Sequence, residues 1–96
     1  MEKSREGKFL KMLGATGTRQ ILEFLGEQDT ARYTQMEEFL NTHTLNKRLR
    51  QLLVFGLVRH HLERAETRKE WYELTEKGRE VLQHLQALVE LIAESS

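Results

Sequence analysis

One central stretch of this 96-residue sequence contains basic side chains and histidines but no carboxylates. No Asp or Glu lies between Glu38 and Glu63, although the chain has 15 acidic residues, which balance 15 Lys and Arg. The basic residues of this acid-free segment are Lys47, Arg48, Arg50, Arg59, His43, His60 and His61. A locally positive surface attracts a polyanion such as DNA even when the whole chain has no net charge.

The spacing of residues in TLNKRLRQLL predicts which of these side chains could read DNA. If the leucines of this segment face the core of a helix, the side chains that project outward are Asn46, Lys47 and Arg50. Arg can pair with guanine O6 and N7, and Asn can pair with adenine N6 and N7. Lys47 can reach a base or a phosphate. We give the flanking Arg48 a smaller role.

The start of the same helix predicts a phosphate contact. Thr42, His43 and Thr44 lie there, and backbone and side-chain donors at a helix N-terminus suit a phosphate group. The alternative is that the charges form the solvated face of an ordinary amphipathic helix. The absence of carboxylates across the segment favours DNA contact.

The N-terminal third of the sequence predicts two helical segments. Residues 1–7 are polar and are expected to be flexible. The first helix contains Phe9–Leu13 and closes at Gly14. Thr18 can cap a second helix, and Gly26 can end it.

The middle of the chain predicts two helices joined by a tight turn. An extended segment, Ala31–Tyr33, precedes a capping box in which Thr34 is the cap and Glu37 lies three residues later. After a turn at residues 41–43, Thr42 or Thr44 can cap the helix that runs to about Phe55. Gly56 then supplies a left-handed termination.

The last third predicts a β-hairpin followed by a long helix. Leu57–Leu62 and Glu70–Leu74 read as strands around a polar tip, and Thr75 can cap the last helix. Side chains of neighbouring strand residues point to opposite faces, so His60 and His61 cannot easily hold one metal ion. The full order predicts a mainly α fold with a small hairpin (α+β), a winged helix-turn-helix.

Three segments, ARYTQM, TLNKRLRQLLVFGLV and WYELTEKGREVL, resemble the HxlR type of winged-helix transcriptional regulators over about residues 8–92. The similarity to the MarR, PadR and ArsR groups is looser. The matching positions are Arg32 to Met36, Leu49, Leu52, Gly56, Leu57, Val58, Tyr72, Leu74, Thr75 and Gly78. The resemblance implies a DNA-binding homodimer with the third helix in the major groove and the hairpin against the backbone. The chain departs from the family in having no cysteine and no proline.

The hairpin tip and the segment just before the helix that begins near Thr34 provide further candidate DNA contacts. These residues are Arg64, Arg68 and Lys69 at the tip, with Arg32 as a weaker phosphate candidate. Glutamates are interspersed among the tip cations. The alternative is therefore an exposed loop whose charges screen one another.

The last helix carries more apolar residues than one face needs. The residues Val81, Leu85, Leu88 and Ile92 repeat at intervals of four, three and four, which predicts a dimer interface. The alternative is a single wide stripe buried within one subunit. A homodimer would place two reading helices about 34 Å apart, and we therefore expect a palindromic site.

Composition and motifs exclude several other classes. The sequence predicts a flexible N-terminus at 1–7, a DNA-binding domain at 8–74 and a dimerisation helix at 75–96. No phosphate-binding loop or nucleophile motif indicates an enzyme, and no cofactor or metal is expected. The lack of cysteine excludes thiol redox sensing and fits a cytoplasmic location. No apolar run approaches the roughly 20 residues that span a membrane.

Two other functions stay open at the level of sequence. The first is a winged-helix module that binds another protein and does not bind DNA, a reading which the neutral total charge supports. The second is a regulator with a ligand pocket between the dimerisation helix and the body, for which no polar cluster is visible.

Overall fold

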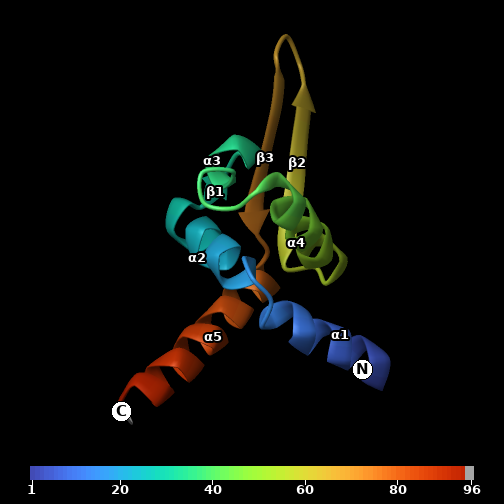
Figure 1. Ribbon diagram of the computed structural model, residues 1–96. Helices are drawn as coiled ribbons and strands as arrows, with labels where there is room; N and C mark the ends of the chain where they lie inside the picture. Colours follow the sequence, from blue (N-terminus) through green and yellow to red (C-terminus); the bar gives the residue numbers. More distant parts are fainter. Residues whose placement is uncertain (95–96) are drawn as a thin grey trace.

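The computed structural model of the protein describes residues 1–94 and has the predicted order of elements (Figure 1). The elements are α1 (Lys3–Leu13), α2 (Thr18–Gln28), β1 (Thr30–Ala31), α3 (Tyr33–Met36), α4 (Thr42–Val54), β2 (Val58–Arg64), β3 (Arg68–Leu74) and α5 (Glu76–Glu94). This arrangement confirms the winged helix-turn-helix. The last two residues of the predicted 75–96 segment lie outside the described residues.

The first two helices differ from their predicted bounds. α1 starts at Lys3, within the segment that we expected to be flexible. The prediction that Thr18 caps α2 is wrong, because the cap is Gly17 in the left-handed region (φ 93°). Thr18 is instead buried, and its hydroxyl donates to the Met12 carbonyl oxygen. α2 also continues past Gly26, whose missing side chain leaves room for Leu82 of α5.

The caps of α3 and α4 lie slightly earlier than predicted. The Gln35 side-chain oxygen accepts the Arg32 backbone N–H at 2.8 Å, so the Thr34–Glu37 capping box is wrong. Asn41 caps α4 by accepting the Thr44 N–H at 2.9 Å. The predicted caps Thr42 and Thr44 therefore lie inside α4. Asn is at least as good a cap as Thr.

The end of α4 and the start of α5 match their predictions. Gly56 adopts the left-handed conformation (φ 72°) that ends α4. Thr75 caps α5, because its hydroxyl oxygen accepts the Gly78 N–H at 3.0 Å. The same hydroxyl donates to the Gly56 carbonyl oxygen at 2.6 Å. The termination of α4 and the start of α5 are thus joined by one side chain.

The three strands form one antiparallel sheet in the order β1-β3-β2. The hairpin strands are longer than predicted, since β2 reaches Arg64 and β3 begins at Arg68. Figure 1 shows this β2–β3 wing extending away from the helices, while α1 and α5 diverge at the opposite end.

The core lies between the helices and the base of the sheet. Its fully buried side chains come from α1, α2, α3, α4 and the turn before β2, and they include Leu25, Met36 and Leu57. α5 contributes the buried Leu82 to this core, and its half-buried Val81 and Leu85 pack against it. No helix among the described residues is long and apolar enough to cross a membrane.

Candidate nucleic-acid interface

The outward face of α4 has the predicted composition. The three leucines of the inward face, Leu45, Leu49 and Leu52, are at most 4 % exposed. Asn46, Lys47 and Arg50 are all exposed on the other side of the helix. The predicted orientation of the helix is therefore confirmed, because the leucine spacing determines which face packs.

Asn46 is held in place by a residue that the sequence did not single out. The Tyr33 hydroxyl, at the start of α3, donates to Asn46 Oδ1 at 2.7 Å. Both side chains have polar atoms near the surface of the motif, and the bond joins the first helix of the motif to the second. It orients the amide while leaving the Asn46 N–H₂ group available as a donor.

The N-terminus of α4 is less basic than the sequence suggested. Thr42 and His43 are exposed, whereas Thr44 is half-buried. The Thr42 hydroxyl donates to Glu37 Oε2 at 3.3 Å, so folding brings a carboxylate close to this end of the helix. Asn41 already accepts the Thr44 N–H. The predicted phosphate contact therefore depends on the remaining amide groups and on His43.

Arg48 belongs to the scaffold of α4. Its side chain is half-buried, and its Nε donates to the Thr16 carbonyl oxygen at 2.8 Å. One of its terminal nitrogens also donates to Gln51 Oε1 at 3.1 Å. Arg48 thus ties α4 to the α1–α2 turn.

The wing brings its cations together with Arg32. Arg64, Arg68 and Lys69 are exposed at the far end of the hairpin, where Arg64 and Arg68 are directly paired in the strand register. Arg32 lies with Arg68 and Lys69 around a shallow cavity of about 280 Å³ that Trp71 also lines. Three of the four predicted backbone contacts therefore share one surface.

The two adjacent histidines occupy opposite faces of the wing, as expected. His60 stacks on Tyr72 and hydrogen-bonds Glu70 at 2.6 Å. His61 stacks on Trp71 with ring centroids 5.0 Å apart, which half-buries the Trp71 side chain. Within the described part of the chain, no group of three or more potential ligands could hold a metal ion.

Glu73 connects the wing histidine to a basic residue. His61 hydrogen-bonds its Oε1 at 2.7 Å, and Arg59 donates to the same oxygen at 3.0 Å. The hydrogen bond from His61, followed by that from Arg59, lowers the pKa of Glu73 below its usual 4.5. Arg59 therefore forms an ion pair within the sheet and is less available to a ligand than Lys47 and Arg50 of α4.

The predicted dimer residues divide into two groups along α5. Val81 and Leu85 are half-buried and pack against the core of their own chain. Leu88 and Ile92 are 60 % and 69 % exposed. Only the outer half of the predicted stripe is therefore exposed for contact with a second chain.

The fold and the exposed cationic face of α4 define a winged helix-turn-helix protein. A sequence model of the HxlR-like helix-turn-helix family matches residues 12–96, and the chain belongs to this family. Family and fold are those of winged-helix transcriptional regulators. A comparison with curated proteins finds no significant sequence match.

Solved structures confirm the fold over nearly all of the chain. A transcriptional regulator homologue from Pyrococcus horikoshii OT3 has a TM-score of 0.80 and 23% identity, covering 99% of this chain and 97% of that one. The reduced form of the transcriptional regulator YodB from B. subtilis has a TM-score of 0.74 and 25% identity, covering 100% and 98%. A PadR family regulator from Eggerthella lenta DSM 2243 has a TM-score of 0.66 and 19% identity, covering 97% and 88%.

Proposed function

We propose that this chain is a sequence-specific regulator of transcription that binds double-stranded DNA as a homodimer. The observation that carries the proposal is the outward face of α4, where Asn46, Lys47 and Arg50 are exposed in a segment without carboxylates. A helix of this kind fits the major groove, where base edges present distinct donor and acceptor patterns. Membership of a family of regulators supports the same function.

In this proposal the side chains of α4 have different roles. Arg50 suits a two-pronged contact with guanine, and Asn46, oriented by Tyr33, suits adenine. Lys47 adds charge toward a base or a phosphate. Arg64, Arg68, Lys69 and Arg32 would contact the DNA backbone, which sets the orientation of the protein but carries little sequence information.

The proposed homodimer rests on apolar side chains at the end of the molecule opposite the wing. Leu10 on α1 is 58% exposed, and Leu88 and Val89 on α5 are 60% and 40% exposed. Between these helices lies a cavity of about 270 Å³ lined by Phe9, Leu13, Val81 and Leu85, among others. A second copy that covered this surface would remove several large apolar side chains from water. The two α4 helices of such a dimer would face a palindromic site.

Selection of binding sites from a pool of random duplexes tests the proposal. We expect enrichment of a palindrome whose half-sites are centred about 10 base pairs apart, one turn of DNA. Retention of DNA without any enriched sequence would contradict sequence-specific reading. The competing function, a winged helix that binds another protein, predicts that the chain retains no DNA at low salt.

A further inference from the structure

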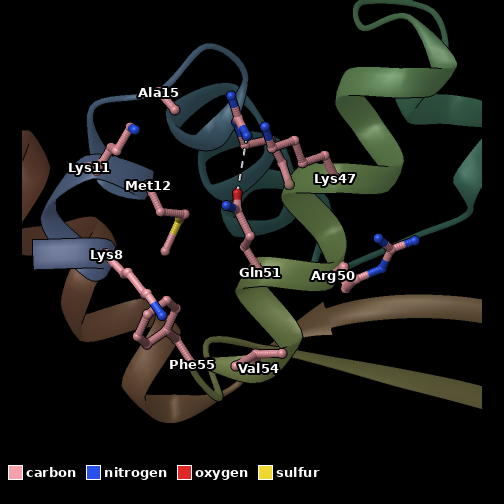
Figure 2. A pocket seen from close by; sticks show the side chains of 10 residues that line it. Lys8, Lys11, Met12, Ala15, Lys47, Arg50, Gln51, Val54 and Phe55 are labelled. Carbon is pink, nitrogen blue, oxygen red and sulfur yellow. Dashed lines mark hydrogen bonds between the residues drawn. The ribbon is translucent and has the colours of Figure 1, made fainter. Parts of the chain in front are cut away.

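A second basic site lies beside the proposed DNA-reading face, between α1 and α4. It is a cavity of about 460 Å³, within the size range of pockets that bind small organic molecules. Figure 2 shows Lys8 and Lys11 on α1 on one side of the cavity and Gln51 and Val54 on α4 on the other. This place differs from the pocket between the dimerisation helix and the body that the sequence left open.

The charge of this cavity has one sign. Its lining includes the five cations Lys8, Lys11, Lys47, Arg48 and Arg50, and no carboxylate. Arg48 is occupied by Thr16 and Gln51, and in Figure 2 the Arg50 side chain points away from α1. None of the three lysines forms a salt bridge to a carboxylate of residues 1–94. Three ammonium groups are therefore available to an anion.

The rest of the lining is apolar and aromatic. Met12, Val54 and Phe55 all contribute to it. Phe55 is fixed by an edge contact with Phe9, with ring centroids 5.2 Å apart, and by the Arg5 guanidinium 5.1 Å from its ring centre. Val54 is 66 % exposed, so a ligand that covered its side chain would remove apolar surface from water and be stabilised.

We propose that this cavity binds a small amphipathic organic anion, such as an aromatic carboxylate. The apolar body of the ligand would cover Val54 and Phe55, and its carboxylate would meet Lys8, Lys11 and Lys47. A DNA phosphate has no apolar body to match such a lining. A second copy of this surface would bring cations against cations across a two-fold axis.

The site also gives the ligand a way to regulate DNA binding, a step that rests on the proposed function. Lys47 lines the cavity and is one of the three exposed side chains of the DNA-reading face. A carboxylate bound to Lys47 neutralises a charge that DNA would use. Anion and DNA would therefore compete, and the anion would release the regulator from its site.

NMR titration with 1-naphthoate and with its neutral amide, 1-naphthamide, tests the site on the full chain. We expect naphthoate to shift backbone signals of α1 and of α4 from Lys47 onward saturably. The amide should bind about five- to tenfold more weakly, since it lacks the charge-assisted contacts. Equal affinity for the two probes, or shifts centred on other elements, would overturn the proposal.

Charge variants separate this cavity from general attraction of anions. Lys8→Gln/Lys11→Gln should weaken naphthoate binding about fivefold or more, whereas the charge-matched control Lys3→Gln/Arg79→Gln should bind it like the natural chain. Equal losses in both variants would overturn the assignment to this cavity. A change in oligomeric state of Lys8→Gln/Lys11→Gln, together with a failure to bind naphthoate, would also overturn the assignment. The cavity would then be an interface between copies of the chain.

Displacement of labelled DNA by naphthoate tests the competition separately. Naphthoate should release DNA from the natural chain at lower concentrations than from Lys8→Gln/Lys11→Gln. A naphthoate-saturated protein that keeps its DNA would overturn the competition. The NMR titration needs no DNA, so a chain that binds naphthoate at α1 and α4 but never binds DNA would show that the proposed function had failed and the site had not.

Discussion

Two arginines on α4, two residues apart in the sequence, have different surroundings. Arg48 donates to the Thr16 carbonyl oxygen and to Gln51, whereas Arg50 is exposed on the outward face. Arg48→Ala should therefore lower the free energy of unfolding by about 0.5–1.5 kcal/mol, the net worth of a typical intramolecular hydrogen bond. Arg50→Ala should leave stability almost unchanged and weaken DNA binding. Urea unfolding and DNA titration of both variants check this, and identical profiles for the two would contradict it.

The wing carboxylate Glu73 should make stability depend on pH. Hydrogen bonds from His61 and Arg59 lower its pKa below the usual 4.5. Its contribution to stability is therefore complete above that usual value and is lost as the pH falls through the lower pKa of the folded state.

Urea unfolding at a series of pH values measures this contribution. The natural chain should lose more stability on acidification below pH 4.5 than Glu73→Gln does. The control Glu66→Gln changes an exposed carboxylate at the hairpin tip and should follow the natural chain. Parallel curves for the natural chain and Glu73→Gln would show that Glu73 does not contribute.

At the scale of single residues, the sequence predicted the direction in which side chains point better than it predicted their hydrogen-bond partners. The outward position of Asn46, Lys47 and Arg50 followed from the leucine spacing alone. The bond from Tyr33 to Asn46 joins residues 13 positions apart. Glu37 likewise comes close to Thr42 only through a turn whose path local spacing does not define.

At the scale of elements, Gly78 shows how closely α5 packs against the chain before β2, and Gly7 on α1 serves as a comparison. A methyl group added at Gly78 would lie 2.0 Å from the Leu57 carbonyl oxygen, whereas one added at Gly7 on α1 meets nothing within 4 Å. Gly78→Ala should cost about 2–3 kcal/mol of unfolding free energy, because backbone would have to move. Gly7→Ala should stabilise the chain by about 0.5–1 kcal/mol through helix propensity. Thermal and urea unfolding measure both, and equal effects would contradict the close contact.

The errors in element boundaries share a physical cause. Gly17 and Thr18 are neighbours, as are Asn41 and Thr42, and each pair offers two acceptable caps. Which residue serves as the cap depends on burial. The Thr18 side chain is buried in the core, where its hydroxyl donates to the Met12 carbonyl oxygen, so Gly17 is the cap. Thr75 was predicted correctly because Glu76 follows it in the first turn of α5 and no competing cap lies beside it.

For the whole molecule, the exposed apolar side chains of α1 and α5 predict self-association. Leu88→Glu should convert a dimer to a monomer, because a charge would then have to be buried at the interface. Gln83→Glu adds the same charge to an exposed position of α5 and should stay dimeric. Sedimentation equilibrium distinguishes the two states. A monomeric natural chain, or a dimeric Leu88→Glu, would contradict the proposed interface.

The architecture of the whole chain could be predicted from the sequence, but its functional surface only in part. The element order followed from hydrophobic periodicity and from end signals such as Gly56 and Thr75. The cavity between α1 and α4 could not be foreseen, since its lysines come from segments about 40 residues apart. Likewise, whether Val81 and Leu85 face their own core or a partner depends on how α5 leaves the body.

The central claim is that the acid-free face of α4 binds DNA, and fluorescence anisotropy at several salt concentrations tests it most directly. We predict binding to a mixed-sequence duplex that weakens steeply with salt, with a shallower slope and lower affinity in Lys47→Ala/Arg50→Ala. The charge-matched Lys3→Ala/Arg79→Ala should bind like the natural chain. No binding at low salt, or equal binding by both double variants, would contradict the claim and favour an acidic protein partner for this face.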